Sequence, residues 1–468
     1  MRRVHGPART GTRWGCPCRP ETEAGRRWAI RRTRLWYNSR SLPGFRTRAP
    51  LAVLFAVNTL NFYDRVVLGA LLEPIRREFR LGDAQMGALV TWFVVVYAVA
   101  GVPLGRMADR GSRRGLLAAG VALWASLTAS AAMASNYGML LVSRLGVGIG
   151  EAVCAPAATS WIGDVAPASR RSRALALFML GLPLGTTLSF AVGGPMAQAW
   201  GWRSALVLAA APALLLVPAL LALPEPHRGG AEHNAAEPRG APERGRTLDL
   251  LRIPTLRWII ASGALINFNL YVLATFLPAF LTRHHGLPVG TAGLWSGIGL
   301  GAAGAAGGLA AAAWGDRIAA KHRRRRMTAA AAAVLASVPA ACAGVLLPPG
   351  AAAAIPLLVA CSGLLNMYYG LVYASIQDVV EPPSRGTAMA LYFAAMYLCG
   401  GAFGPVVAGR LSDVLARRAL ATGAAAEAAR SAGLQQAMLL IPVLSIGLAA
   451  VLWAGSRTIE RDLYSATP

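Results

Sequence analysis

The sequence predicts an all-α membrane protein with about twelve transmembrane helices in two pseudo-symmetric six-helix bundles. Three observations predict this fold class. Of the 468 residues, 55% are hydrophobic and only 14% are charged, whereas soluble proteins carry roughly 25% charged residues. Apolar runs of about 20 residues, long enough to cross a bilayer, follow one another from Leu51 onward. The two halves of the chain also carry similar motifs at similar spacing.

The chain is strongly basic, with a net charge of +25 and an isoelectric point near 11.2. A basic chain can indicate nucleic-acid binding. Here the arginines lie at the edges of apolar runs instead of forming a stripe on polar helices, so we expect a lipid bilayer and no nucleic acid as partner. Four cysteines lie inside apolar runs, and the pair Cys16 and Cys18 lacks the second ligand pair that a zinc site needs. We expect no metal and no other cofactor.

Residues 1–49 form an Arg-rich tail without the apolar core of a signal peptide. Two interpretations stay open, a disordered cytoplasmic tail and an artefact of an upstream start codon. The apolar runs then define an N-terminal bundle over 50–223, a polar cytoplasmic linker over 224–252, a C-terminal bundle over 253–456 and a C-terminal tail over 457–468. Each run must be helical, because a backbone in lipid has no water to satisfy its amides. The predicted spans lie near 51–72, 84–108, 115–134, 137–160, 172–199, 203–223, 257–282, 290–315, 327–347, 352–376, 386–410 and 434–454.

Basic loops predict the orientation of the spans. Arginines cluster after spans two, four and eight, whereas the loops after spans three, five and nine carry almost none. Loops rich in Lys and Arg stay in the cytoplasm. We therefore expect a multi-pass protein of the bacterial inner membrane with both termini in the cytoplasm. The basic loops after spans one and eleven are exceptions to the pattern.

The two halves repeat one another around spans two and eight. Leu81 and Asp109 bound span two, and Leu287 and Asp316 bound span eight, so the two spacings differ by one residue. A duplicated six-helix unit is expected to place its binding site between the halves near the middle of the membrane.

The turn between spans two and three reads Gly105-x-x-x-Asp109-Arg110-x-x-Arg113-Arg114. It resembles the signature loop of the major facilitator superfamily, which is thought to close the cytoplasmic side in one state. The resemblance implies a gate in which Asp109 pairs with Arg113 or Arg114. A weaker second copy ends in Asp316-Arg317. The alternative is a simple topology anchor, which would explain the arginines but not Asp109.

Charged residues inside spans one and four are the candidate coupling site. Span one carries Asp64 and Arg65, and span four carries Arg144 and Glu151, two turns apart on one face. A charge within the bilayer costs about 3 kcal/mol or more, so it needs a partner or an aqueous cavity. We expect Asp64 and Arg144 to meet at one depth, with Glu151 deeper, and to act as a proton or substrate switch. A fixed structural ion pair is the alternative.

The segments around these residues also resemble the bacterial spinster-like branch of the superfamily. The resemblance rests on Asn61-Phe-x-Asp64-Arg65, Gly148-x-Gly150-Glu151-Ala152 and Gly181-x-Pro183-x-Gly185, and it covers about residues 51–205. Eukaryotic members of that branch transport lysolipids and sphingolipid phosphates. The resemblance implies a lipid-like or small organic substrate, although Asp-Arg in span one also occurs in organic-anion symporters.

Polar residues in other spans are candidates for the substrate cavity. They are Asn58 and Asn61 in span one, Asn267 in span seven, and Asn366, Tyr369, Tyr373 and Gln377 in span ten. For each of them a plain hydrogen bond between helices is the alternative. The run Gly299-x-Gly301-x-x-Gly304 matches a dinucleotide fingerprint by letter, but no strand precedes it, so it predicts a close helix contact.

The sequence therefore predicts a monomeric, proton-coupled secondary transporter that works by alternating access, with a lean towards efflux. An organic-anion symporter is the alternative within transporters, and a membrane sensor is the alternative outside them. We expect no enzyme, because no nucleophile with an adjacent base and no metal cluster occurs.

Overall fold

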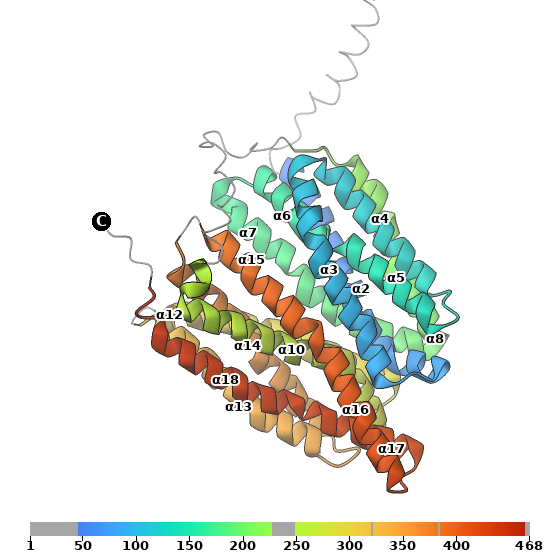
Figure 1. Cartoon of the computed structure of the whole chain (residues 1–468). Coiled ribbons are helices and arrows are strands. Elements are labelled where there is room, and N and C mark those ends of the chain that lie inside the picture. Colours follow the sequence, from blue (N-terminus) through green and yellow to red (C-terminus); the bar gives the residue numbers. More distant parts are fainter. Residues whose placement is uncertain (1–44, 227–248, 320–321, 382–383, 464–468) are drawn as a thin grey trace, which may run out of the picture. The chain divides into compact units, whose positions relative to one another are not determined.

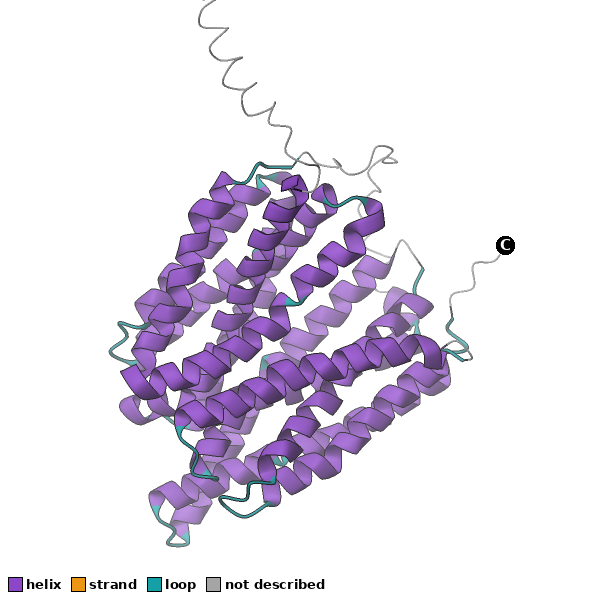
Figure 2. Ribbon diagram, turned by 180° about the vertical axis from the view of Figure 1, so that it is seen from behind, coloured by secondary structure: helices purple, strands orange, loops and turns teal. Residues whose placement is uncertain are grey.

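The computed structural model describes residues 45–226, 249–319, 322–381 and 384–463, and within these ranges every regular element is a helix (Figure 2). Residues 1–44 of the predicted N-terminal tail (1–49) and residues 227–248 of the predicted linker (224–252) lie outside the described residues, and so does the side chain of Asp316. Residues 45–49 of the predicted tail belong to the first helix. Residues 50–468 form one compact unit, and residues 1–49 are a separate unit. The description below concerns the larger unit.

The described residues of the first half form the helices labelled in Figure 1 from α2 to α8. They are α2 (Phe45–Phe79), α3 (Asp83–Arg110), α4 (Arg113–Ala131), α5 (Tyr137–Glu151), α6 (Cys154–Val165), α7 (Ala168–Met179) and α8 (Gly181–Ala222). Capping residues begin two of them. The Ser112 hydroxyl accepts a hydrogen bond from the Gly115 amide at the start of α4, and the Asn136 side chain accepts one from the Met139 amide at the start of α5.

The second half begins with a short 3-10 turn and then repeats the pattern. Its elements are η1 (Leu250–Arg252), α10 (Pro254–Arg283), α11 (Val289–Gly297), η2 (Ile298–Ala303), α12 (Gly304–Ala319), α13 (Arg324–Leu346), α14 (Ala354–Val379), α15 (Arg385–Ala395), η4 (Met396–Gly401), α16 (Phe403–Ala421), α17 (Ala426–Met438) and α18 (Leu440–Thr458). Both η2 and η4 are π-helical turns, in spans eight and eleven.

Eleven stretches of the described chain are long and apolar enough to cross a membrane. One of them, over 170–222, has 53 residues, which at 1.5 Å per residue is about twice what a bilayer needs. The backbone of Gly201 interrupts it, with φ 81° and ψ 159°, a conformation that favours glycine. Gly201 lies between predicted spans five and six, so the stretch crosses twice and the predicted twelve-helix architecture is confirmed.

The helices of the two halves gather on different sides of the unit, blue to green on one side and yellow to red on the other (Figure 1). The halves meet along two main seams, α3 against α16 and α8 against α11. Glycines allow the close approach. A Cβ atom on Gly87 of α3 would lie 2.3 Å from the Pro405 carbonyl oxygen, and one on Gly301 of η2 would lie 2.0 Å from the Thr187 hydroxyl. The Gly299-x-Gly301 run is therefore a helix contact, as predicted.

The unit has two ends, which correspond to the two sides of the membrane. We call the end at which α3 passes into α4 the motif end, and the end at which α2 passes into α3 the far end. His284 and His285, at the far end of α10, are both buried against Phe280.

Candidate transport site

The predicted charged residues of spans one and four form one buried network. Arg65 Nε lies 3.1 Å from Glu151 Oε2, and Arg144 Nη1 lies 3.8 Å from Asp64 Oδ2. All four side chains are at most 5% exposed. The helices α2 and α5 thus place two carboxylates and two guanidinium groups together. The expected pairing of Asp64 with Arg144 is present, and Glu151 has its own partner in Arg65.

Thr128 of α4 joins the network, although no sequence pattern distinguishes it from other threonines in apolar helices. Its hydroxyl donates to Asp64 Oδ2 at 2.8 Å and accepts from Arg144 Nη2 at 3.1 Å. The side chain is fully buried. A threonine in an apolar helix usually bonds its own backbone, so only the packing of α4 against α5 reveals its role.

One oxygen of each carboxyl group is uncommitted. Asp64 Oδ1 and Glu151 Oε1 are buried and accept no hydrogen bond from the guanidinium and hydroxyl groups around them, while the Asp64 and Glu151 carboxyl groups lie close enough to share a hydrogen bond with each other. A buried acceptor without a donor costs about 1 to 3 kcal/mol. One proton held by either carboxyl group would supply a donor to the other.

Arg65 also points towards a ring of aromatic side chains. Its guanidinium carbon lies 4.2 Å from the centre of the Tyr97 ring and 4.7 Å from that of Phe62. Tyr271 and Tyr397, which belong to the second half, interact with the same cation, and Tyr397 stacks edge-on against Tyr97 at 5.6 Å. Such cation–π contacts stabilise a desolvated guanidinium group. Arg65 therefore lies where the two halves meet.

The two predicted asparagines of span one have different surroundings. Asn61 Oδ1 accepts a hydrogen bond from Arg65 Nη2 at 3.2 Å, so Asn61 belongs to the network. Asn58 donates to the Phe178 carbonyl oxygen at 2.7 Å and is buried. Asn58 therefore holds α2 against α7, as the hydrogen-bond alternative predicted.

In the second half, Asn267 and Tyr369 lie together. The Tyr369 hydroxyl donates to Asn267 Oδ1 at 3.3 Å, and Asn267 Nδ2 donates to the Met396 carbonyl oxygen at 2.8 Å. Tyr373 extends this group, with its ring centre 5.4 Å from that of Tyr369. Met396 begins the π-helical turn η4, so Asn267 satisfies a carbonyl that this turn displaces.

Two further cavity candidates are less distinctive. Asn366 donates to the Ser362 carbonyl oxygen one turn earlier at 2.9 Å, which is the local hydrogen bond of an ordinary helix residue. The backbone carbonyl of Gln377 accepts from Arg385, and its side chain is half-buried. Neither contact distinguishes a cavity residue from a packing residue.

The motif turn is arranged differently from the expectation. Arg113 is buried and bonds Asp164 and the Ser160 hydroxyl, while Asp109 and Arg110 are exposed. Asp109 forms no ion pair with any described residue, so its predicted pairing with Arg113 or Arg114 is wrong for this conformation. The reason is that Asp164 on α6 offers Arg113 a carboxylate that is better shielded from solvent than that of Asp109.

Glu225 caps the helix that follows the motif turn. Its carboxylate accepts hydrogen bonds from the Ser112 hydroxyl at 2.7 Å and from the backbone amides of Arg113 and Arg114 at 2.9 and 3.0 Å. Partial burial alone would raise the pKa of the Glu225 carboxyl, but these hydrogen bonds and Arg113 hold that pKa below its usual range. A carboxylate at a helix N-terminus also complements the helix dipole.

The remaining motif residues have open surroundings. A Cβ atom on Gly105 would meet only Pro156, at 3.9 Å, so Gly105 leaves room without being in tight contact. Arg317, in the second copy, is exposed. Neither Gly105 nor Arg317 makes a close contact across the motif end.

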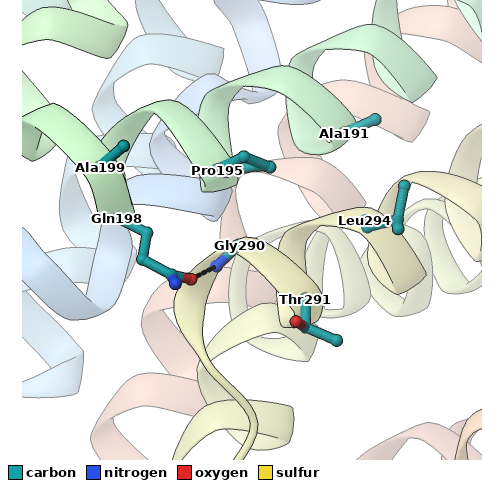
Figure 3. Close-up of a pocket in the computed structure, with 7 residues that line it drawn as sticks. All are labelled: Ala191, Pro195, Gln198, Ala199, Gly290, Thr291 and Leu294. Carbon is teal, nitrogen blue, oxygen red and sulfur yellow. Dashed lines mark hydrogen bonds between the residues drawn. The ribbon is translucent and has the colours of Figure 1, made fainter.

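The seam between α8 and α11 carries a shallow groove (Figure 3). Ala191, Pro195 and Leu294 supply apolar walls, and the Gln198 side chain crosses the groove to accept the Gly290 amide at 2.8 Å. The groove therefore lies beside a neutral hydrogen bond between the two halves.

Comparison with known sequences decides the family. The sequence model of the Major Facilitator Superfamily matches residues 54–405. The chain belongs to this superfamily of transporters.

Relatives within the superfamily agree with the resemblance found in the sequence. A protein of Mycolicibacterium smegmatis described as an MFS-type efflux pump is 32% identical over 421 residues, which is 89% of this chain and 94% of that protein. The human protein spinster homolog 1 is 32% identical over 251 residues, 52% of this chain, and the match spans about half (47%) of that protein.

Solved structures agree as well. A crystal structure described as a bacterial homolog to the human lysosomal transporter spinster, in an inward-facing and unoccupied conformation, superimposes with a TM-score of 0.81. The two chains are 26% identical, and the match covers 92% of this chain and all of that one. The chain is thus a spinster-like member of the superfamily.

Proposed function

We propose that this protein is a proton-coupled secondary transporter that moves a small organic or amphipathic solute across the bacterial inner membrane by alternating access. The observation that carries the proposal is the buried network of Asp64, Arg65, Arg144 and Glu151, with one uncommitted oxygen on each carboxylate. Buried charges inside a membrane protein mark ion or substrate pathways.

The ion pair between Arg65 and Glu151 suggests how proton binding could be coupled to the change of access. When Glu151 is ionised, Arg65 is neutralised by it and held at the seam between the halves. A proton on Glu151 cancels that carboxylate and leaves the guanidinium group of Arg65 without its counter-ion. Because Arg65 contacts Tyr97 and interacts with Tyr271 and Tyr397 of the other half, its change of partner alters the contacts between the halves. Proton binding would therefore shift the balance between the two access states.

The aromatic surroundings favour a solute with an apolar body. Tyrosines of both halves line the region around Arg65, and Tyr369 and Tyr373 extend it into the second half. Rings accept apolar and cationic groups, and a guanidinium group accepts an anion. An organic-anion symporter remains the alternative, because Arg65 and Arg144 both lie in this region. The efflux-pump description of the mycobacterial relative supports export.

Orientation and domain division are part of the proposal. The motif end collects the arginines of the turns after spans two, four and eight, which supports its placement in the cytoplasm together with both termini. We take residues 50–223 and 253–456 as the two bundles that rock against each other, with a single chain as the working unit.

The test is transport by purified protein in proteoliposomes. Glu151→Gln and Asp64→Asn, in protein that inserts and elutes as the wild type does, should abolish transport driven by a pH gradient while leaving exchange without a gradient measurable. Asn58→Ala, which removes only the bond to the Phe178 carbonyl oxygen, is the matched control and should keep coupled transport. Full pH-driven transport in both acidic variants would refute the coupling assignment.

A further inference from the structure

A second group of buried charges lies at the far end, away from the central network. This far-end charge cluster comes from four helices, α2, α3, α10 and α16. Its members are Glu73, Arg76, Asp83, Arg283 and Asp413. Glu73, Asp83 and Arg283 are at most 5% exposed, although they lie where the chain leaves the membrane. Charges so well buried at a surface loop need a reason beyond solubility.

Arg283, the last residue of α10, connects the two halves. Its Nε atom lies 2.6 Å from Glu73 Oε2, and its two Nη atoms lie 2.8 Å from the two oxygens of Asp83. One guanidinium group of the second half thus holds two carboxylates of the first half, the Asp83 contact being bidentate. Ser412 of α16 adds a hydrogen bond to Asp83 Oδ2 at 2.7 Å.

Asp413 of α16 makes the complementary contact. Its carboxylate accepts hydrogen bonds from the backbone amides of Asp83 and Ala84, both at 2.9 Å. These amides are at the start of α3, where they have no partner within the helix. A carboxylate at that position also complements the helix dipole. Gly82 makes room for it, because a Cβ atom there would lie 2.7 Å from Asp413 Oδ2.

The pseudo-symmetry of the chain supplies an internal comparison. Gly87 and Gly293, and likewise Ala84 and Gly290, are 206 positions apart. The Ala84 amide is capped by the charged Asp413, whereas the equivalent Gly290 amide is capped by the neutral Gln198 at 2.8 Å. Arg283 itself corresponds to Arg77, which is 61% exposed and bonds Glu73 within the first half. The duplicated unit has therefore acquired charge on one of its two far-end seams only.

If the two halves separated at the far end, some of these carboxylates would keep their ion-pair partners and others would lose them. Glu73 would keep Arg76 and Arg77, which come from its own helix. Asp83 would lose Arg283 and the Ser412 hydroxyl, and its described ion pairs and side-chain hydrogen bonds include no replacement from the first half. Asp413 would lose the α3 amides. The cluster is satisfied only while the far end is closed.

We propose that the far-end charge cluster is the gate that closes the far side of the transport pathway, with Arg283 as the residue that must leave Glu73 and Asp83 before that side opens. The proposal rests on transport by alternating access, as proposed above. It adds a named latch at the end opposite the signature motif, and it predicts that α3 and α16 separate at a higher cost than α8 and α11.

The test measures conformation, so it does not depend on transport. In a background with the native cysteines replaced, spin labels are attached at Ser135→Cys in the first half and Thr422→Cys in the second, two exposed positions at the far end. Distances are measured by electron–electron resonance in lipid nanodiscs. Arg283→Gln should raise the ratio of long to short distances by at least about tenfold, because its removal leaves the buried Asp83 carboxylate without its ion-pair partner. Arg283→Lys should return most of the short-distance population.

Arg77→Gln is the matched control, since Arg77 bonds the same Glu73 carboxylate but belongs to the first half. It should leave the distance distribution within about twofold of the wild type. An unchanged distribution in Arg283→Gln overturns the gate. An equal shift in Arg77→Gln also overturns it, because the effect would then come from Glu73 alone.

Asp413→Asn provides a second route if Arg283→Gln does not insert. It keeps the size of the side chain and removes the charge at the α3 amides, so it should shift the distribution in the same direction. A short-distance population equal to that of the wild type would contradict the proposal. Failure of the coupling proposal would give a different result. The variants Asp64→Asn and Glu151→Gln would then still show pH-driven transport, and the effect of Arg283→Gln on the far-end distances would be unchanged.

Discussion

Thr128 is the shared hydrogen-bond partner of Asp64 and Arg144. The Asp64 and Arg144 side chains are 3.8 Å apart, and the threonine hydroxyl lies between them with a hydrogen bond to each. An ion pair in direct hydrogen-bond contact would not need a bridging hydroxyl group. The hydroxyl can exchange its donor and acceptor roles when Asp64 gains or loses a proton, so Thr128 serves both protonation states.

Thr128→Val should therefore disturb coupling and stability together. Valine has nearly the same shape but leaves Asp64 and Arg144 without their shared partner. We expect the free energy of unfolding to fall by about 1 to 3 kcal/mol, measured by thermal unfolding in detergent, and the pH dependence of transport to shift. Thr128→Ser keeps the hydroxyl and should stay close to the wild type. Equal stability of the valine and serine variants would contradict this role.

The contacts of Glu225 predict how the stability of the protein changes at acidic pH. Its pKa is lower in the folded protein than in the unfolded chain. Its contribution to stability is therefore complete above the unfolded pKa, near 4.3, and disappears as the pH falls through the lower folded pKa. The difference in melting temperature between wild type and Glu225→Gln should be constant from pH 8 to about 5 and shrink towards pH 3. A difference that grows on acidification would show that the assigned sign is wrong.

The charged residues were predictable individually, and their neighbours were not. Asp64, Arg65, Arg144 and Glu151 stand out because an ionisable group inside an apolar run is costly. Thr128, Tyr97 and Tyr397 do not stand out, because threonine and tyrosine are ordinary in such helices. Only the packing of α3, α4 and η4 brings them to the charges. Asp109 illustrates the reverse case, since its motif was recognised but its partner depends on the conformation.

At the scale of elements, the one-residue difference between spans two and eight has a physical explanation. Span two is a continuous helix, α3, whereas span eight contains the π-helical turn η2 between α11 and α12. A π-helical turn accommodates one extra residue in a helix. Leu287 precedes the turn and lies 206 positions after its counterpart Leu81. Asp316 follows the turn and lies 207 positions after its counterpart Asp109. Sequence spacing indicated an insertion, but not that it would be absorbed within the helix.

The seam between α3 and α16 makes a prediction about glycine. Gly87→Ala would place a Cβ atom 2.3 Å from the Pro405 carbonyl oxygen and 2.6 Å from its carbonyl carbon. Backbone atoms cannot turn away as a side chain can, so we expect a loss of about 1 to 3 kcal/mol in unfolding free energy. Gly101→Ala, on the same helix with nothing within 4 Å, should be neutral or gain up to about 1 kcal/mol from helix propensity. Thermal unfolding should show a loss of stability in Gly87→Ala that is absent in Gly101→Ala, and equal losses in the two variants would argue against the contact.

At the scale of the whole molecule, the twelve-span architecture was predictable because apolar runs, basic loops and the repeat all point to it. The arrangement of the two halves was not, because it depends on which seam residues meet. Nothing in the sequence distinguishes the seam residues from the other glycines and acidic residues of the chain. Only their contacts do so: Gly87 with Pro405, Gly301 with Thr187, and Asp413 with the α3 amides.

Orientation is testable on the full chain. With the native cysteines replaced, Ser135→Cys at the far end and Glu460→Cys beyond α18 are both exposed. A membrane-impermeant maleimide added to intact cells should label Ser135→Cys and not Glu460→Cys, because the arginine-rich end is expected in the cytoplasm. Labelling of Glu460→Cys before permeabilisation would reverse the proposed orientation.

The single-residue break at Gly201 has a mechanical consequence. Spans five and six are joined by one non-helical residue, so the connection holds no slack. The segment beyond it runs about 30 Å to the motif end, where Glu225 grips the Ser112 turn. The segment before it carries Gln198 against α11. Spans five and six therefore change direction at Gly201 without an intervening flexible loop, and span six links the α11 side of the far end to the Glu225 contacts at the motif end.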